Sequence, residues 1–199
     1  MPDARTQDPL DLFQQWLADA QACKAIEEPT AMTLATIDEL GLPDARIVLL
    51  KGCDARGVTF YTNLTSPKAR QLEARPQAAL CFHWMPLERQ VRMAGPVVKV
   101  SDEEADAYFA TRPRQSQIGA WASKQSQPLT GRFELERRVA RFTAQFGLGP
   151  VVRPPFWSGF CLQPLRIEFW QKRPFRLHER RQFKRLDLLS GWSCCRIYP

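Results

Sequence analysis

The chain has 199 residues, of which 44% are hydrophobic and 25% charged, and its formal net charge is +7. These values are typical of a folded globular domain and exclude a wholly disordered or fibrous chain. No apolar run reaches the roughly 18 residues of a membrane-spanning helix, and the opening MPDARTQDP lacks a secretory signal, so we expect a cytoplasmic protein that does not bind membranes.

A helix and then short strands are predicted for the first half of the chain. Asp8 before Pro9 favours a helix start, and apolar residues recur at helical spacing to about Cys23. Segments rich in β-branched and apolar residues follow, separated by turn residues, and a short helix is predicted at 67–74. The predicted strands of this half are 30–37, 45–50, 58–62, 78–84 and 89–100.

The second half is predicted to hold helices and then the last strands. Ser101 and Glu104 form a capping box that opens a helical segment, and a long amphipathic helix is expected at roughly 131–146. The Gly- and Pro-rich stretch 147–155 is predicted to be a connecting loop. The final predicted strands are 165–171, 175–184 and 192–198. Short strands joined by turns favour an antiparallel barrel in one mainly β, α+β domain.

The six cysteines show neither a CxxC pair nor zinc-ligand spacing with histidine, so we expect reduced thiols and no metal. The positive charge is compatible with a nucleic acid, a membrane surface or small anions, and charge alone does not choose among them. Motifs for Rossmann cofactor binding, P-loop hydrolysis, lipase-type acyl transfer and zincin chemistry are absent from the sequence.

The run from Tyr61 to Lys68 leaves a strand, turns, and enters a helix with Ser66 as the expected cap and Pro67 at its first position. Free N–H groups at a helix start, together with a lysine, suit a phosphate. The alternative is an ordinary capped surface helix. Arg46 and Lys51 bracket a second apolar strand, either to address anions or as strand-end charges that reach water.

The only histidines are His83 and His178. In an extended segment Arg176, His178 and Arg180 would share one strand face, so two guanidinium groups and an imidazole would converge. A lone histidine is usually structural, but one flanked by two arginines on its own face is a candidate site residue.

Long stretches of the chain, in order, carry a family resemblance: DPLDLFQQWL, PTAMTLATID, RIVLLK, FYTNLTSPKARQLE, LERQVRMAG, YFATRPRQSQIGAWASKQS, PPFWSGF, IEFWQKRPFRLHER and GWSCCRIYP. They run from Asp8 to Pro199 and resemble the pyridoxine/pyridoxamine 5'-phosphate oxidase family. The resemblance implies a split β-barrel of Greek-key type with flanking helices, the FMN-binding split barrel. It implies one domain over 8–199, with a dimerisation and substrate-site segment at about 156–199, after a short leader at 1–7 that we expect to be disordered.

The resemblance also implies a homodimer with FMN at the subunit interface. Its reaction would be oxidation of pyridoxamine or pyridoxine 5'-phosphate to pyridoxal 5'-phosphate in vitamin B6 metabolism, with O2 as acceptor and release of H2O2. The implied FMN contacts are Arg46, Ile47, Val48, Leu49, Leu50, Lys51, Tyr61, Thr62, Lys68, Gln90, Gln125, Ser126, Trp170 and Arg180. The implied substrate contacts are Lys51, Tyr108, Arg112, Ser116, Arg176, Leu177 and His178, of which Arg176 and His178 would be catalytic.

One residue departs from the family pattern. Members commonly have a second basic residue beside the phosphate-binding lysine, and Pro67 stands there. Two other functions stay open: a related FMN enzyme with a different substrate, and a non-catalytic protein that binds pyridoxal 5'-phosphate or nucleic acid. We expect no nucleic-acid partner, because the aromatic residues fit a barrel core better than a nucleotide platform.

Overall fold

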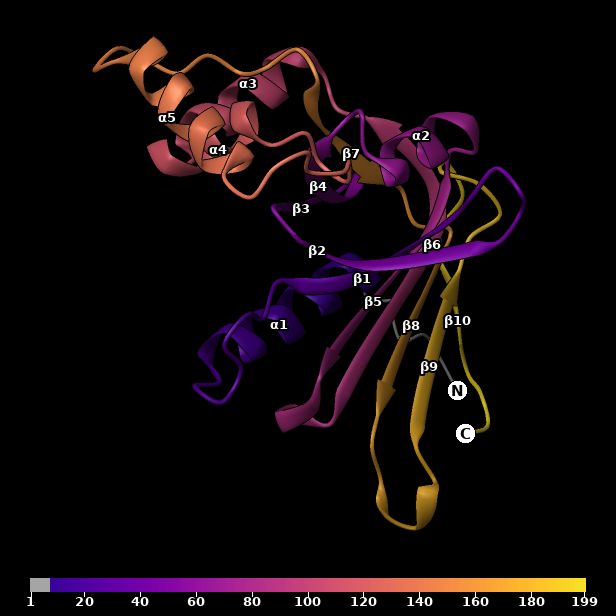
Figure 1. Ribbon diagram of the computed structural model, residues 1–199. Coiled ribbons are helices and arrows are strands. Elements are labelled where there is room, and N and C mark those ends of the chain that lie inside the picture. The colour runs from indigo at the N-terminus through magenta and orange to yellow at the C-terminus, as the bar shows by residue number, and fades with distance from the viewer. Residues whose placement is uncertain (1–7) are drawn as a thin grey trace.

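The computed structural model describes residues 8–199 as an antiparallel sheet curled into a half-barrel, with helices around it (Figure 1). The strands are β1 (Ala31–Ile37), β2 (Pro43–Leu49), β3 (Gly52–Asp54), β4 (Gly57–Asn63), β5 (Gln77–Trp84), β6 (Arg89–Lys99), β7 (Trp157–Leu162), β8 (Arg166–Gln171), β9 (Glu179–Lys184) and β10 (Ser193–Arg196). The α-helices are α1 (Pro9–Ala22), α2 (Pro67–Ala74), α3 (Asp102–Thr111), α4 (Arg114–Ala122) and α5 (Glu134–Phe146). Two 3-10 turns are η1 (Met85–Leu87) and η2 (Pro174–Arg176).

Strand β6 joins the two parts of the sheet. Its segment Arg89–Ala94 pairs with β8, whereas its last three residues pair with β7. The main path is β10-β9-β8-β6-β5-β1-β2, and β3 and β4 attach through β7. Gly95 lies where β6 changes partner, and a Cβ atom there would stand 2.1 Å from the Gln163 carbonyl oxygen. Only glycine allows the two backbones to approach so closely.

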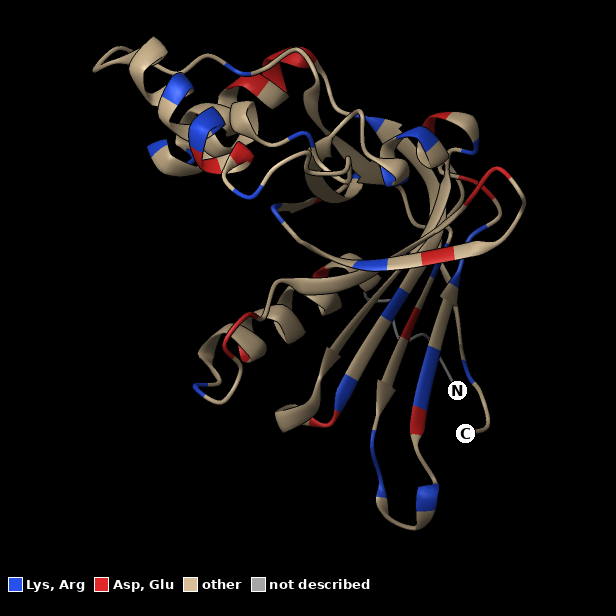
Figure 2. Ribbon diagram, viewed as in Figure 1, with Lys and Arg blue, Asp and Glu red and all other residues tan. Residues whose placement is uncertain are grey.

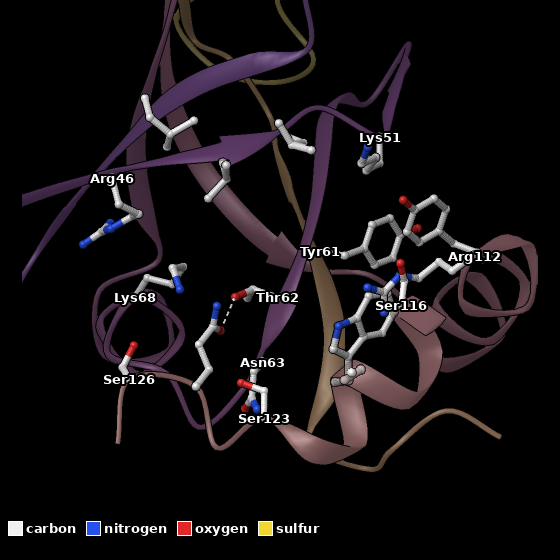
Figure 3. Close-up of a pocket in the computed structure, with 18 of the residues that line it drawn as sticks. Arg46, Lys51, Tyr61, Thr62, Asn63, Lys68, Arg112, Ser116, Ser123 and Ser126 are labelled. Atoms are coloured by element: carbon white, nitrogen blue, oxygen red, sulfur yellow. Dashed lines mark hydrogen bonds between the residues drawn. The ribbon is translucent and has the colours of Figure 1, made fainter. Parts of the chain in front are cut away.

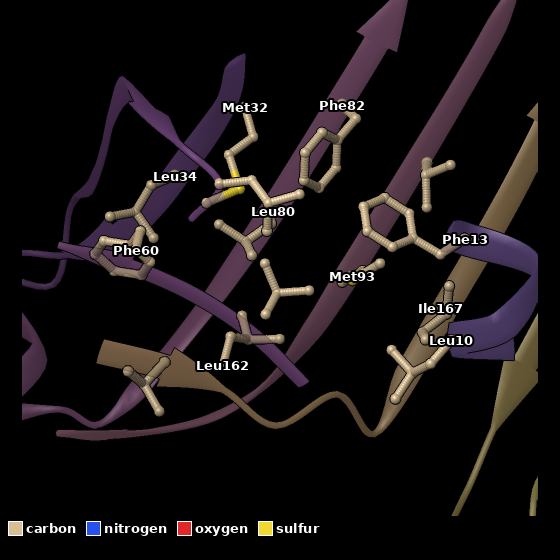
Figure 4. Packing of buried hydrophobic residues seen from close by; sticks show 14 of the residues in the cluster. Leu10, Phe13, Met32, Leu34, Phe60, Leu80, Phe82, Met93, Leu162 and Ile167 are labelled. Atoms are coloured by element: carbon tan, nitrogen blue, oxygen red, sulfur yellow. The ribbon is translucent and has the colours of Figure 1, made fainter. Parts of the chain in front are cut away.

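The main hydrophobic core lies between the curled sheet and α1 (Figure 4). Alternate residues of β1, Met32 and Leu34, point into it and are almost completely buried, as the two-residue period of a strand requires. Phe13 of α1 is fully buried, with its ring centroid 4.9 Å from that of Phe82. Burial of one such side chain contributes roughly 1.5–3 kcal/mol.

Helices α3, α4 and α5 form a second packed unit beside β4 and β7 (Figure 1). Its buried residues are Phe109, Ile118, Val151 and Trp157. This packing places the turn between α3 and α4 next to β4. That turn supplies part of the cavity described below.

Basic residues are spread over helices and strands and are interspersed with acidic ones (Figure 2). Many already have a partner; Arg153, for example, pairs with both Asp102 and Asp106. A buried cation without such a partner is therefore informative in this protein.

Most predicted elements are confirmed. The Asp8 carboxylate accepts a hydrogen bond from the Leu10 N–H at 2.8 Å and starts α1, and the Ser101 hydroxyl accepts from the Glu104 N–H at 3.1 Å and starts α3. Strands β3 and β7 and helix α4 were not predicted. Every residue of β7 is buried, so its sequence has no alternation to recognise.

Two local predictions are wrong. Ser66 does not cap α2 with its side chain, because its hydroxyl donates to the Asn63 carbonyl at 2.7 Å instead. The strand predicted at 175–184 begins only at Glu179, because residues 174–176 form a 3-10 turn in which Phe175 and Arg176 have φ of 57° and 62°. Arg176 therefore does not share a strand face with Arg180, and the two-residue period that predicted their convergence does not apply to it. The leader predicted at 1–7 lies outside the described residues.

Candidate functional site

A cavity of about 930 Å³ lies between β2, β4, α2 and the α3–α4 turn (Figure 3). It brings together predicted site residues from distant parts of the sequence: Arg46, Ile47, Val48, Leu49, Lys51, Tyr61, Thr62, Lys68, Tyr108, Arg112, Ser116, Gln125 and Ser126. In Figure 3, Arg46 and Lys68 lie on one side of the cavity and Arg112 and Ser116 on the other.

Lys68 provides a positive charge at the first side. It follows Pro67 in the first turn of α2, is only 8% exposed, and has no hydrogen-bond or ion-pair partner among the described residues. Burial, and secondarily the nearby Arg46, lowers the pKa of its ammonium group. A buried cation at a helix start that lacks an anionic partner is suited to an anion such as phosphate.

Arg46 is held beside Lys68 by the surrounding protein. Its guanidinium pairs with Asp44 and donates to Thr36 Oγ1 at 2.6 Å. It also donates to the Leu34 carbonyl at 3.2 Å and to Gln71 Oε1 at 3.3 Å. These bonds fix the position of the guanidinium but occupy much of its donor capacity.

Arg112 provides the charge at the second side. It directly follows α3, and its guanidinium carbon lies 4.7 Å from the ring centroid of Trp157 and 5.5 Å from that of Phe109. Its Nη1 atom is buried with no hydrogen-bond partner. Burial lowers the pKa of this group, which still stays ionised because a guanidinium is a very weak acid. Ser116, in the first turn of α4, lies next to it in Figure 3.

Three nearly parallel aromatic rings line the wall near Arg112. Tyr61 and Tyr108 stack with centroids 4.0 Å apart, and the Trp157 ring is within 8° of parallel to each. Burial raises the pKa of Tyr61 to about 12 and also raises the pKa of Tyr108. Both side chains therefore remain neutral phenols near pH 7.

The middle of the cavity carries uncharged polar groups. The Thr62 hydroxyl donates to Gln125 Oε1 at 3.3 Å, the interaction drawn in Figure 3. Ser126 has φ of 66°, an uncommon backbone conformation for a residue other than glycine. Hydroxyl and amide groups here can bind the polar parts of a ligand lying between the two cations.

Seven predicted site residues do not line this cavity. Leu50 is 5% exposed and packs in the main core. Gln90, Trp170 and Arg180 are direct cross-strand neighbours on β6, β8 and β9. Arg180 Nε donates to the buried Glu168 at 2.9 Å, and its Nη1 donates to the Tyr198 carbonyl at 3.0 Å.

Arg176, Leu177 and His178 lie at the turn between β8 and β9, which projects from the rest of the sheet (Figure 1). Leu177 is 67% exposed. His178 Nδ1 accepts a hydrogen bond from the Arg173 N–H at 3.3 Å, and its ring centroid is 4.7 Å from that of Trp170. In the neutral imidazole this bond leaves the proton on Nε2.

Sequence reasoning missed several cavity residues: Asp44, Asn63, Thr111, Pro113, Gly119, Ala120, Ser123 and Trp157. Trp157 is the most informative of these. It belongs to PPFWSGF, a stretch that carried the family resemblance, but its position in an unpredicted strand hid its orientation. Residues 8–199 contain no cluster of His, Cys, Asp and Glu that could hold a metal ion, and no helix among them is long and apolar enough to cross a membrane.

Comparison with known proteins identifies the family. Residues 18–146 match the family model described as pyridoxamine 5'-phosphate oxidase, and residues 157–199 match the pyridoxine 5'-phosphate oxidase C-terminal dimerisation region. The chain is 59% identical to the pyridoxine/pyridoxamine 5'-phosphate oxidase of Azorhizobium caulinodans over 192 residues, covering 96% of this chain and 90% of that one. It is 55% identical to the protein of the same name from Agrobacterium fabrum, over 96% of this chain and 93% of that one.

Solved structures agree with the sequence comparison. PhzG from Burkholderia lata 383, in complex with tetrahydrophenazine-1-carboxylic acid, has a TM-score of 0.91 and 31% identity over 99% of this chain and 95% of that one. A pyridoxamine 5'-phosphate oxidase-related, FMN-binding protein from Nostoc punctiforme has a TM-score of 0.76 and 19% identity over 98% and 99%, which shows a shared fold. The predicted split-barrel fold is thus confirmed, and the chain belongs to the pyridoxine/pyridoxamine 5'-phosphate oxidase family.

Proposed function

We propose that this protein catalyses the FMN-dependent oxidation of pyridoxamine 5'-phosphate or pyridoxine 5'-phosphate to pyridoxal 5'-phosphate. The observation that carries this proposal is one cavity with an unpartnered cation on each side, the buried Lys68 and the half-buried Arg112, whose Nη1 atom is buried (Figure 3). FMN and the substrate each carry a phosphate and a flat ring. Two such ligands stacked face to face need a separate cation for each phosphate. The proposed location is the cytoplasm, in keeping with six unpaired cysteines.

The residues around Lys68 fit FMN. Lys68 and the start of α2 would hold its phosphate, with Arg46 beside them. Among the described residues β2 pairs with β1 alone, so the backbone N–H and C=O groups along its other edge remain available to the polar edge of the flavin ring. Thr62, Gln125 and Ser126 would complete the contacts. Bound there, FMN supplies the hydride acceptor.

The residues around Arg112 fit the substrate. Its buried and unpaired Nη1 requires an acceptor that the described protein does not provide, and a phosphate oxygen meets that need. Ser116, Tyr108 and Lys51 would add hydroxyl and ammonium donors. The first turn of α4 has no side-chain cap, so its backbone N–H groups also favour an anion.

We propose that the site is completed by a second copy of the chain and that 8–199 forms one domain whose 156–199 segment reaches the partner. Gln90, Trp170, Arg180 and the turn holding Arg176 and His178 lie outside the cavity formed by their own chain. The exposed turn between β8 and β9 would enter the cavity of the partner subunit. The match of 157–199 to a family dimerisation region supports this arrangement.

Arg176 and His178 would act on the reacting end of the substrate. Oxidation removes a hydride from the carbon bearing the amine or hydroxyl, and a proton from that nitrogen or oxygen. The alcohol then gives the aldehyde directly, whereas the amine gives an imine that water converts to aldehyde and ammonia. With Nδ1 occupied, His178 would present Nε2 to the substrate, and Arg176 would orient the ring. O2 would accept the two electrons and two protons and leave as H2O2.

A second candidate keeps the barrel and FMN but changes the substrate. It is favoured by the 31% identical PhzG structure, which holds tetrahydrophenazine-1-carboxylic acid. That acid has a carboxylate in place of a phosphate. Lys68 and the partly desolvated Arg112 fit the phosphate-bearing pair better, because a dianion gains more than a monoanion from a charge-assisted bond to a guanidinium.

An anaerobic titration tests the proposal. The purified protein should be yellow, and its flavin absorbance should bleach on addition of pyridoxamine 5'-phosphate and return when air is admitted, with formation of peroxide. Bleaching only with tetrahydrophenazine-1-carboxylic acid would support the second candidate. A colourless protein that gains no activity with added FMN, or binding of nucleic acid with steep salt dependence, would reject both.

A further inference from the structure

Arg112 and Arg46 are held in the same cavity by different means. Arg46 is fixed by an ion pair and hydrogen bonds, which use its N–H groups. Arg112 has no hydrogen bond or ion pair from its side chain to any described residue, and its contacts are the faces of Trp157 and Phe109. Stacking against a ring engages the flat face of a guanidinium and leaves the in-plane N–H donors free.

The Trp157 ring is rigidly placed. The residue is 6% exposed and starts β7, where it pairs with Asn63 of β4. Its carbonyl accepts from Arg153 Nη1 at 2.8 Å, and its ring meets Phe109 edge-on at 5.1 Å. A ring anchored by backbone and side chain in this way can fix a flexible arginine that lies against it.

A second contact fixes the backbone near Arg112 without touching its guanidinium. The buried Gln117 side chain of α4 donates to the Phe109 carbonyl at 2.9 Å, so it ties α4 to the end of α3. The backbone position is thus set by Gln117, whereas the side-chain direction depends on the rings.

We propose that Trp157 is a positioning residue: its indole face directs the Arg112 guanidinium into the cavity with its donors free, and this sets the preference for phosphorylated over unphosphorylated ligands. The inference rests on the proposed function, since it takes the phosphate of the substrate as the anion at Arg112. It assigns Trp157 no part in hydride or proton transfer.

The proposal predicts that replacing Trp157 weakens the binding of phosphorylated ligands only. In the FMN-loaded protein, Trp157→Leu should raise the Kd of pyridoxal 5'-phosphate about tenfold, the scale of a largely desolvated cation–π contact. The Kd of unphosphorylated pyridoxal should stay unchanged. Trp157→Phe keeps a weaker aromatic face and should raise the first Kd only about threefold. Isothermal titration calorimetry of each variant with both ligands gives the two values.

A double-mutant cycle shows whether Trp157 acts through Arg112. In an Arg112→Gln background, Trp157→Leu should cause no further loss of pyridoxal 5'-phosphate binding. Trp121→Leu is the matched control, because Trp121 lies in the same hydrophobic cluster but not at the cavity or against Arg112. It should lower the melting temperature and leave the ratio of the two Kd values as in the wild type.

Equal weakening of both ligands by Trp157→Leu, or its full effect in the Arg112→Gln background, would overturn the proposal. If the leucine variant does not fold, Trp157→Phe decides in its place, and an unchanged Kd for pyridoxal 5'-phosphate overturns the inference. These titrations measure binding without turnover. A protein that does not oxidise pyridoxamine 5'-phosphate would therefore refute the proposed function, whereas the titrations would still test the role of Trp157.

Discussion

Lys68→Met should change apoprotein stability and FMN affinity in opposite directions. Lys68 is 8% exposed and has no hydrogen-bond or ion-pair partner among residues 8–199, so the apoprotein buries a positive charge that the more distant Asp44 carboxylate offsets in part. Methionine keeps much of the hydrophobic stem and removes that charge. A gain of about 1 kcal/mol in the free energy of unfolding corresponds to a rise of roughly 2–4 °C in melting temperature for a chain of this size.

The same substitution removes a charged donor from the proposed FMN phosphate site. A hydrogen bond to a charged group contributes about 1.5–3 kcal/mol, so the Kd of FMN should rise roughly 10- to 150-fold. Quenching of FMN fluorescence during titration of the apoprotein measures this Kd, and differential scanning fluorimetry measures the melting temperature. Lys99→Met, at an exposed position outside the cavity, is the matched control. An unchanged FMN Kd, or a less stable apoprotein, would refute the assignment of Lys68.

Three further outcomes follow from the site. Pro67→Arg should lower the Kd of FMN several-fold in the same titration, because it places a second cation beside Lys68; no gain would show that Pro67 is not near the phosphate. Changing both Arg176 and His178 to Ala should abolish oxidation while absorbance still reports bound FMN, whereas loss of flavin would contradict their assignment to the substrate. The Tyr61 pKa of about 12 lies above that of the unfolded chain, so its contribution to stability is complete below pH 10 and is lost as the pH rises toward 12. The fall in stability between pH 10 and pH 12 should therefore be shallower for Tyr61→Phe than for the wild type. Identical stability curves for the two proteins would contradict a raised pKa at Tyr61.

Local chemistry made much of the fold predictable. Asp8 and Pro9 mark the start of α1, and alternating residues such as Met32 and Leu34 mark β1, because caps and periodicity act over a few residues. Strand β7 escaped prediction because it is buried on both faces. The turn at Arg176 escaped because a positive φ at a residue other than glycine has no strong sequence signal.

The site was only partly predictable for a different reason. The family resemblance indicated Lys68 and Arg112, and the structure places both at one cavity. It could not indicate that Trp157 lies against Arg112, because that contact joins residues 45 positions apart through an unpredicted strand. Nor could it indicate that Arg180 binds Glu168, since that pair depends on the register of β8 with β9. Side-chain partners are set by tertiary packing, which short motifs do not encode.

The separation of Arg112 from His178 has a genetic consequence on the proposed dimer. If each active site takes Arg112 from one chain and His178 from the other, two defective chains can restore each other. A mixed dimer of one Arg112→Gln chain and one His178→Ala chain would contain a doubly damaged site and an intact one. Co-expression of the two inactive variants would therefore recover measurable activity, and a cell carrying both alleles would have a working enzyme although neither allele encodes one.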